Sequence, residues 1–362
     1  MKIVIFAGGV GTRLWPLSRK KTPKQFEKII NNQSTLQLSV KRLLSEFNPQ
    51  DIYVSTNIAY ETIVKKQLPQ LPENNFFFEP EKKNVGPAIA LVAGYFYRFQ
   101  DPEEPFVILW SDHLIKKEKF FCEIIQNGVN YINQEKNKIL FIGIDPRFPS
   151  TNLGYIHYGQ QIKKESSFAL HQFRGFRYKP DPETAEQYFQ SGEYAWNLGY
   201  FISTPKFIYQ AFKRYTPDLY RKVEKILNHR GQEDCAQALS QIYSQIEPIS
   251  FDNAIPENID PKKAVVMVVE DFGWSDIGTW ELIQEAFQDE NGNYFCGKTY
   301  TKDVFNSLIY NKEKKKLIVC FGSKNLVVVN TKDVLMVIEK SALPRLKEIL
   351  NDLATSDKSN LL

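Results

Sequence analysis

The stretch Lys2-Ile3-Val4-Ile5-Phe6-Ala7-Gly8-Gly9-Val10-Gly11-Thr12-Arg13 decides the fold. Its apolar first half predicts a buried strand, and the glycines that follow predict a tight loop. In such a loop, successive backbone N–H groups can approach the oxygens of a phosphate. Arg13 adds a planar guanidinium that can hold an oxyanion with two parallel hydrogen bonds. We therefore predict a phosphate-binding loop after the first strand; a plain strand-to-helix turn with a solvated Arg13 is the alternative.

The glycine spacing differs from that of two common phosphate loops. Gly8, Gly9 and Gly11 fit neither the dinucleotide pattern GxGxxG nor the pattern GxxxxGK[ST]. Lys24, in Pro23-Lys24-Gln25-Phe26, supplies a second cation a short loop away. Two cations beside a glycine-rich loop favour a phosphate ligand over a purely structural turn.

Short apolar runs alternate with longer segments that carry apolar residues at helical spacing. The runs that predict strands are 2–6, 51–55, 76–79, 105–109, 138–144 and 264–269. The segments that predict helices are 36–47, 59–67, 86–99, 120–135, 184–190 and 217–227. Strands and helices in alternation, with crossovers of this length, favour an α/β fold in which helices cover both faces of a parallel sheet.

The pattern changes after about residue 288. Short strands without intervening helices are predicted at 293–302, 307–310, 316–321 and 326–330, and a helix at 342–353. This spacing is typical of a small β domain, and a short β-helix is one form of it. We therefore divide the chain into an α/β domain, residues 1–288, and a small C-terminal β domain, residues 289–362, that ends in a helix.

The composition argues against several classes of protein. The chain has 362 residues, 43% of them hydrophobic, and its 46 Lys and Arg against 42 Asp and Glu leave a net charge of +4. This charge is too small to indicate a nucleic-acid partner, and no apolar run reaches the ~18 residues of a membrane span. The four cysteines show no metal-binding spacing, and the first residues show no secretion signal. We expect a cytoplasmic protein with reduced thiols and no nucleic-acid or membrane partner.

The first motif extends further than a phosphate loop requires. Residues 6–19 followed by 23–26, with Trp15-Pro16-Leu17-Ser18-Arg19 and Pro23-Lys24-Gln25-Phe26, resemble the signature of the sugar-nucleotide pyrophosphorylases. Their form is most similar to that of the members that use GTP and mannose 1-phosphate. The resemblance continues, in chain order, through 79–90, Ser111-Asp112-His113, 152–156, Trp196-Asn197-Leu198-Gly199 and 274–280. The C-terminal segment resembles the β domain of the short, single-function members.

The resemblance implies a fold, a reaction and a set of site residues. The fold is a Rossmann-like nucleotidyltransferase domain with a mixed, mostly parallel sheet, followed by a small β-helix-like domain. The reaction is an in-line attack of a sugar 1-phosphate oxygen on the α-phosphorus of GTP, which releases pyrophosphate. The implied catalytic residues are Arg13, Lys24 and Lys179; the nucleotide-binding residues are Gly8, Gly9, Gly11, Thr12, Glu79, Asn84 and Gly86; the sugar-binding residues are Gly154, Tyr178, Asn197 and Asp252.

Two aspartates are candidates for a metal site. Asp112 follows the apolar run 106–110, and Asp276 lies in a turn at 273–278. The carboxyl ends of parallel strands form the edge where open α/β sheets bind ligands. Mg²⁺ takes a few carboxylate oxygens and leaves its other positions to water and phosphate, so the pair suits Mg²⁺. In the family that the chain resembles, this pair is the metal site; a helix cap at Asp112 and a turn role for Asp276 are the alternatives.

Several residues depart from the family pattern, chiefly on the sugar side. Tyr178 stands where the family has a glutamate that binds sugar hydroxyls, and a phenol makes fewer hydrogen bonds than a carboxylate. The sugar therefore stays open: mannose 1-phosphate leads, and another sugar 1-phosphate or nucleotide is an alternative. A non-catalytic regulator that binds nucleotide sugars is the alternative from another class. A homodimer is a further prediction, drawn from the surface that a β domain offers.

Overall fold

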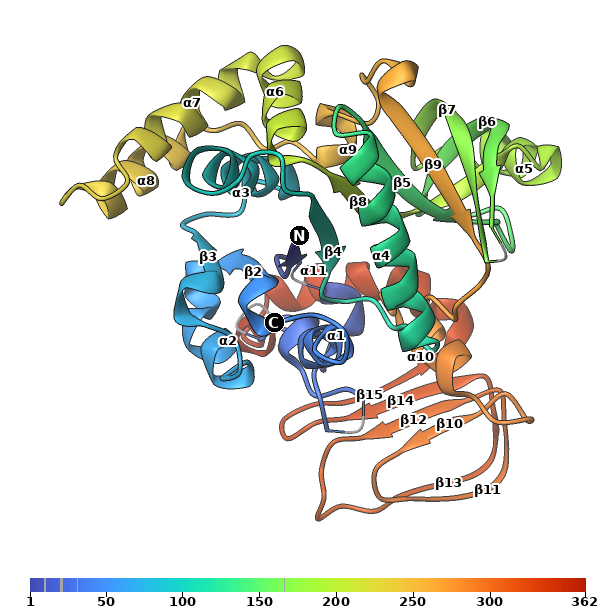
Figure 1. Ribbon diagram of the computed structural model, residues 1–362. Helices are drawn as coiled ribbons and strands as arrows, with labels where there is room; N and C mark the ends of the chain where they lie inside the picture. Colours follow the sequence, from blue (N-terminus) through green and yellow to red (C-terminus); the bar gives the residue numbers. More distant parts are fainter. Residues whose placement is uncertain (10, 20–21, 31, 166) are drawn as a thin grey trace. The chain divides into compact units, whose positions relative to one another are not determined.

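The computed structural model describes residues 1–9, 11–19, 22–30, 32–165 and 167–362 (Figure 1). These residues form two compact units. Unit 1 contains Met1–Gly8, Val40–Ser111 and Ile115–Gly273, and unit 2 contains Gly9–Ser39, Asp112–Leu114 and Trp274–Leu362. Neither unit is continuous in sequence, and the division of the chain after residue 288 remains a prediction.

Unit 1 is built on a mixed sheet. Its strands are β1 (Lys2–Phe6), β2 (Ile52–Asn57), β3 (Phe76–Glu79), β4 (Phe106–Trp110), β5 (Ile139–Ile144), β6 (Gly154–Lys164), β7 (Phe168–Tyr178), β8 (Tyr194–Ser203) and β9 (Ala264–Val269). Over the described residues their order is β3-β2-β1-β4-β8-β5-β9-β7-β6. The first four strands are parallel, β8 is antiparallel to both β4 and β5, and β5 is parallel to β9.

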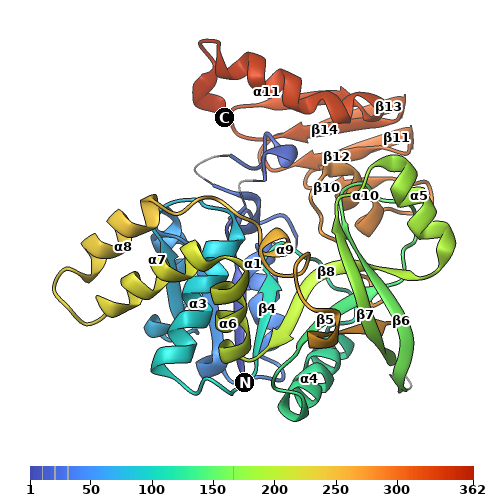
Figure 2. The same ribbon diagram turned by 90° about the horizontal axis from the view of Figure 1, so that it is seen from above.

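Helices cover the two faces of this sheet. The helices of the chain up to residue 273 are α1 (Thr35–Leu43), α2 (Glu61–Gln67), α3 (Val85–Phe99), α4 (Glu118–Gln134), α5 (Pro182–Ser191), α6 (Pro205–Tyr215), α7 (Pro217–Asn228), α8 (Cys235–Ser244) and α9 (Phe251–Ala254). The buried residues of α3, α6, α7 and α9 form one core with Phe141 and Phe201 of the sheet. On the other face, Gly128 of α4 packs closely against Ile202 (Figure 2). Phe201 and Ile202 point to opposite faces because they are neighbours in one strand.

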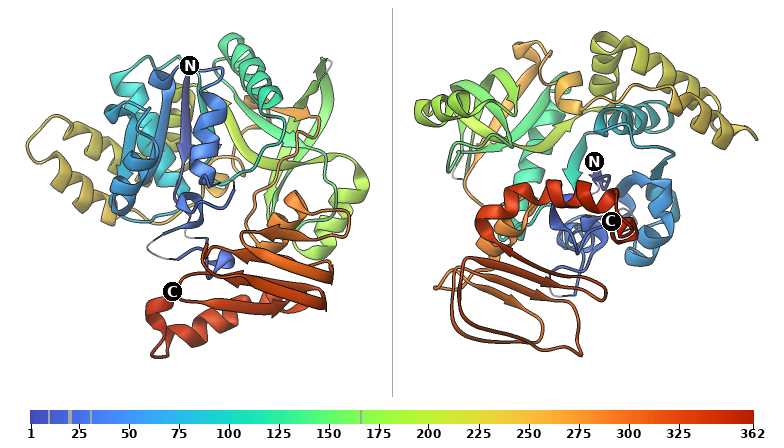
Figure 3. Two further views of the ribbon diagram at one scale, coloured as in Figure 1. Left: turned by 90° about the horizontal axis from the view of Figure 1, so that it is seen from below. Right: turned by 180° about the vertical axis from the view of Figure 1, so that it is seen from behind.

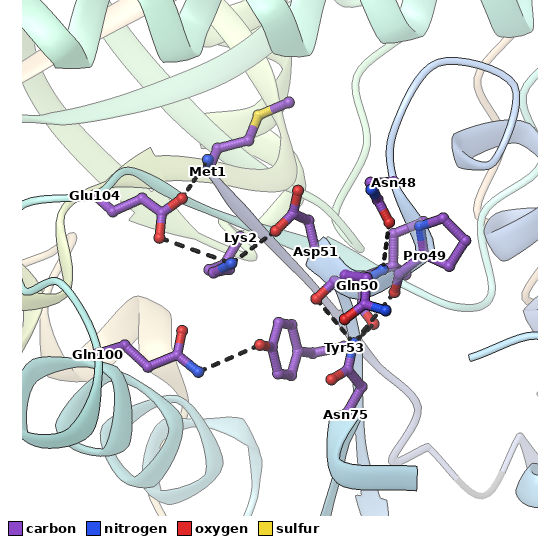
Figure 4. A network of polar contacts seen from close by, with 11 residues as sticks. Met1, Lys2, Asn48, Pro49, Gln50, Asp51, Tyr53, Asn75, Gln100 and Glu104 are labelled. Carbon is purple, nitrogen blue, oxygen red and sulfur yellow. Dashed lines mark hydrogen bonds and ion pairs between the residues drawn. The ribbon is translucent and has the colours of Figure 1, made fainter. Parts of the chain in front are cut away.

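A polar network closes the amino-terminal edge of the parallel strands (Figure 4). The amino group of Met1 pairs with Glu104 at 2.6 Å, and Lys2 Nζ pairs with Asp51 at 2.7 Å. The Asn75 side chain, 5% exposed, donates to the carbonyl oxygens of three residues, Pro49, Gln50 and Ile52. These contacts give the backbone carbonyl groups just before and at the start of β2 a buried side-chain donor.

The C-terminal part of unit 2 has the form of a short β-helix. Its strands and helices are β10 (Tyr294–Cys296), β11 (Thr299–Phe305), β12 (Leu308–Asn311), β13 (Ile318–Lys324), β14 (Leu326–Asn330), β15 (Leu335–Glu339), α10 (Trp280–Phe287) and α11 (Leu346–Ala354). From β10 to β14, successive strands alternate between a sheet of order β10-β12-β14-β15 and the parallel pair β11-β13, and β15 then adds to the first sheet antiparallel to β14. Figure 3 shows this C-terminal part from two further sides. At one corner the side chain of Asn330 donates to Asn311 Oδ1 at 2.9 Å, so equivalent asparagines stack on successive turns.

The core of unit 2 joins its separate segments. Trp280, fully buried, donates from Nε1 to Trp15 O at 3.1 Å. Residues of the N-terminal loop region, of α10 and of the β-helix strands share one buried apolar cluster. Because this cluster includes Leu14 and Leu17, the segment that follows the glycine loop is anchored to the β-rich part of the chain. Among the described residues, no helix is both long enough and apolar enough to cross a membrane.

Candidate functional site

The glycine loop is held in shape by hydrogen bonds to its carbonyl groups. Gln25 Nε2 donates to Gly9 O at 2.8 Å, and Leu14 N donates to Gly11 O at 3.1 Å. The hydroxyl of Ser18 also donates to Gly11 O. Two short 3₁₀ helices follow, η1 (Thr12–Leu14) and η2 (Lys24–Phe26). Two of the loop's carbonyl groups are therefore already bonded to protein. The side chain of Thr12 lies outside the described part of the chain.

Lys24 connects the loop with both candidate metal ligands. Its side chain is 9% exposed, and its Nζ lies 2.7 Å from Asp112 Oδ2 and donates to Asp276 O at 3.2 Å. The stem of Lys24 passes directly over Gly11, where a Cβ atom would lie 2.6 Å from Lys24 Cγ. Gly11 also has a φ of 68°, in the left-handed region that favours glycine. The glycine at position 11 is thus required twice, by the turn and by the lysine.

A β-bridge brings the two aspartates to neighbouring segments. Leu114 N donates to Ser275 O at 2.8 Å, and Ser275 N donates back to Leu114 O at 3.1 Å. Asp112 and Asp276 therefore lie within two residues of one antiparallel contact, although 164 positions separate them in the chain. Next to them, Trp274 Nε1 donates to His113 Nδ1 at 3.2 Å, which orients the imidazole beside Asp112.

The charge state of Asp112 suits a metal ligand. Burial by itself would raise the pKa of this carboxyl group, but the Lys24 ammonium and His113 hold the pKa below its ordinary value. Asp112 is consequently a carboxylate at neutral pH, and 29% of its side chain is exposed. Among the described residues, no group of three or more His, Cys, Asp or Glu side chains gathers into a metal cage. Two carboxylates would leave the other coordination positions of a metal ion to water and phosphate, and this arrangement fits Mg²⁺.

Arg13 lies beside Asp276. A Cβ atom built on Gly278 would lie 3.2 Å from Arg13 Nη2 and 3.3 Å from Asp276 Oδ2. Arg13 is exposed, so its guanidinium is accessible to a ligand. Unit 2 therefore gathers the predicted residues Gly9, Gly11, Arg13, Lys24, Asp112 and Asp276, whereas Gly8 is the last residue of the first segment of unit 1.

The predicted sugar-side residues gather in unit 1. Gly154, at the start of β6, pairs in register with Tyr178 of β7 on one side and with Asn197 of β8 on the other. Lys179 follows β7 with a φ of 48°, and its Nζ lies 4.9 Å from the centre of the Tyr178 ring. Asn197 Nδ2 donates to Asp252 Oδ1 at 3.2 Å. Burial raises the pKa of Asp252 to about 6.

The predicted base-side residues Glu79, Asn84 and Gly86 surround the start of α3. Glu79 ends β3 and is 9% exposed, and the hydroxyl of Tyr243 donates to its Oε2 at 2.5 Å. Burial raises the pKa of Glu79 to about 7, although this hydrogen bond acts in the opposite direction. Asn84 precedes α3 with a φ of 61° and makes no side-chain capping hydrogen bond, and Gly86 N donates to Ile249 O at 3.0 Å.

The sequence motifs miss some residues of these clusters. Gln25 lies within a motif, but nothing in the sequence indicates that its side-chain amide donates a hydrogen bond to the glycine loop. Tyr243 is not among the predicted site residues, and neither is Glu257, which accepts a hydrogen bond from the main chain of Tyr178. Their partners lie 164 and 79 positions away. Residue spacing along the chain carries no signal for contacts of this range.

Comparison with known sequences identifies the class of protein to which this fold and this site belong. Residues 2–292 match the nucleotidyl transferase family, and the chain belongs to that family. Mannose-1-phosphate guanylyltransferase from Escherichia coli is 32% identical over 98% of this chain and 76% of the relative. The protein of that name from Klebsiella pneumoniae is 33% identical over 98% and 74%. These relatives confirm the resemblance drawn from the motifs.

A solved structure supports the fold. The structure described as a mannose-1-phosphate geranyltransferase from Thermus thermophilus superimposes with a TM-score of 0.85. It covers 98% of this chain and 99% of its own, at 24% sequence identity. The predicted fold class, a mixed Rossmann-like sheet followed by a β-helix-like region, is thereby confirmed.

Proposed function

We propose that the chain joins GTP and mannose 1-phosphate to give GDP-mannose and pyrophosphate. The observation that carries this proposal is the position of Lys24, whose ammonium lies 2.7 Å from Asp112 and 3.2 Å from the main chain of Asp276. Cation and carboxylates beside a glycine loop are the groups needed to handle a triphosphate. The relatives are named mannose-1-phosphate guanylyltransferase, and this name supports the choice of substrates.

The chemistry demands charge neutralisation and not a protein nucleophile. The attacking oxygen of mannose 1-phosphate is already anionic, so no general base has to remove a proton. The barrier lies in bringing two polyanions into line at the α-phosphorus of GTP. Asp112 and Asp276 would hold Mg²⁺, which supplies charge neutralisation for phosphate oxygens when it is bound.

In this proposal, cationic side chains of the chain itself neutralise the remaining phosphate charge. Arg13 is exposed and planar, so it can hold two oxygens of the triphosphate by parallel hydrogen bonds. Lys24 stabilises the leaving pyrophosphate as a point charge and keeps Asp112 ionised. Lys179, exposed at the end of β7, neutralises the phosphate of the sugar substrate. Glu79, Asn84 and Gly86 bind the base.

Release of pyrophosphate tests the proposal. The chain is incubated with each of four nucleoside triphosphates and a panel of hexose 1-phosphates, with and without Mg²⁺. We expect pyrophosphate with GTP, mannose 1-phosphate and Mg²⁺ together, and none when any one is omitted. Turnover with a different sugar would favour the second candidate, which Tyr178 motivates: the same chemistry on another sugar 1-phosphate. No turnover with any pair would refute both and favour a regulatory binding protein.

A further inference from the structure

A carboxylate that is not among the predicted site residues lies beside Tyr178. Glu257 Oε1 accepts a hydrogen bond from the main-chain N–H of Tyr178 at 3.3 Å, and its Oε2 accepts from Asn253 Nδ2 at 2.8 Å. Asn253 is fixed in turn by Ser250, whose hydroxyl donates to Asn253 Oδ1 at 2.6 Å. Glu257 is exposed, yet both of its oxygens are oriented by the protein.

This carboxylate belongs to the cluster that gathers the sugar-side residues. Its own N–H donates to Asp252 O at 3.0 Å, and its charge acts to raise the pKa of the Asp252 carboxyl group. Lys179 acts on the same carboxyl group in the opposite direction. The Asp252 side chain is in turn bonded to Asn197. Lys179 just after β7, Asp252 in α9 and Glu257 just beyond α9 are therefore neighbours whose charges act on one another.

The number of hydrogen-bonding sites that each group has left over decides which of them can bind a ligand. The Tyr178 ring lies close to the Lys179 ammonium, and its single hydroxyl can engage only one hydroxyl group firmly. Each oxygen of Glu257 has two lone pairs, of which the contacts above use one. An exposed carboxylate with one remaining acceptor site on each oxygen matches a pair of adjacent hydroxyl groups.

We propose that Glu257 accepts hydrogen bonds from two adjacent hydroxyl groups of the sugar 1-phosphate and so determines sugar selectivity. This inference rests on the proposed function. It assigns the contact with the sugar hydroxyl groups to Glu257, which lies 79 positions from Tyr178 in the sequence. The competing explanation is structural, in which Glu257 only braces the main chain of Tyr178. The two explanations differ in whether removal of a sugar hydroxyl and removal of the carboxylate have additive effects.

Steady-state kinetics with Glu257→Gln separates these explanations. The variant keeps the size of the side chain but loses its charge and one acceptor oxygen. We expect the KM for mannose 1-phosphate to rise about tenfold or more, since the lost bonds are charge-assisted, and the KM for GTP to stay within twofold. Monodeoxy analogues of mannose 1-phosphate supply the second readout. The wild type should discriminate against the analogue that lacks a contacted hydroxyl, and Glu257→Gln should lose that discrimination.

Two further variants complete the test. Glu233→Gln, at an exposed glutamate between α7 and α8, is the matched control and should leave all constants unchanged. The double variant Tyr178→Glu with Glu257→Gln restores a carboxylate at the neighbouring position and should recover part of the sugar affinity. An active wild type whose Glu257→Gln variant keeps the sugar KM and the discrimination would overturn the role of Glu257 alone. An inactive wild type would overturn the proposed function, and this inference with it.

Discussion

Replacing Gly11 by alanine tests the geometry around Lys24 directly. The φ of 68° at this position costs a non-glycine residue about 1–2 kcal/mol. The new methyl group would lie 2.6 Å from Lys24 Cγ, whereas carbon atoms in contact prefer about 3.5 Å or more. The Lys24 stem must therefore retreat by about 1 Å. Because the ammonium contacts both Asp112 and Asp276, we expect kcat/KM to fall about 100-fold, the typical cost of such a misplacement.

The assay is pyrophosphate release with GTP and mannose 1-phosphate, alongside thermal unfolding of each variant. Gly192→Ala is the matched control, because Gly192 has the same φ of 68° but has no atom within 4 Å of an added Cβ. Both variants should lose a similar amount of stability, and only Gly11→Ala should lose activity. If folded Gly11→Ala keeps its kcat/KM within threefold, or Gly192→Ala loses as much activity, the reasoning about Lys24 is wrong.

Three other changes probe the remaining groups. Asp112→Asn should lower turnover by more than about 100-fold and leave the far-ultraviolet circular dichroism spectrum unchanged, because it removes a charge that Mg²⁺ needs; retained turnover would rule out the metal assignment. Gly278→Ala should raise the KM for GTP severalfold without lowering the melting temperature, because its methyl group crowds the ends of Arg13 and Asp276; unchanged kinetics would contradict their placement. Glu79 has a pKa of about 7 in the folded chain against 4.5 in the unfolded one, so the folded state binds the proton more tightly. The free energy of unfolding should therefore fall by about 2 kcal/mol between pH 5 and pH 8. Glu79→Gln should remove that part of the pH dependence in denaturant titrations, and an identical pH profile for the two proteins would count against the buried, protonated carboxyl group.

The predicted elements match the structure best where a segment has one clear periodicity. The strands 2–6, 76–79 and 264–269 and the helix 86–99 agree with β1, β3, β9 and α3 to within one residue. β6 and β7 are not among the predicted strands. The second half of β6 is exposed and largely polar, so no apolar alternation marks it. The single strand predicted at 293–302 is two strands, β10 and β11. The chain turns between them at Gly297, where φ is 85°.

The C-terminal helix shows how one residue shifts a boundary. Apolar spacing predicts a helix over 342–353, but Pro344 lies within that segment. The structure has a 3₁₀ segment, η7 (Lys340–Arg345), and α11 begins only at Leu346. Proline supplies no N–H to the helical ladder, so a regular helix starts after it. Patterns of apolar residues report which face is buried and are less informative about where a helix begins.

What the amino-acid order settles in this chain is local: a strand that ends in a glycine loop, cations just after that loop, and motifs that mark a nucleotidyl transferase. These features follow from backbone freedom and side-chain chemistry over a few neighbouring positions. Folding alone decides which distant groups meet: Lys24 with Asp112 and Asp276, Tyr243 with Glu79, and Glu257 with Tyr178. It also decides the charge of a carboxyl group, because burial and neighbouring charges, which no short stretch encodes, move the pKa of Asp112 down and that of Glu79 up.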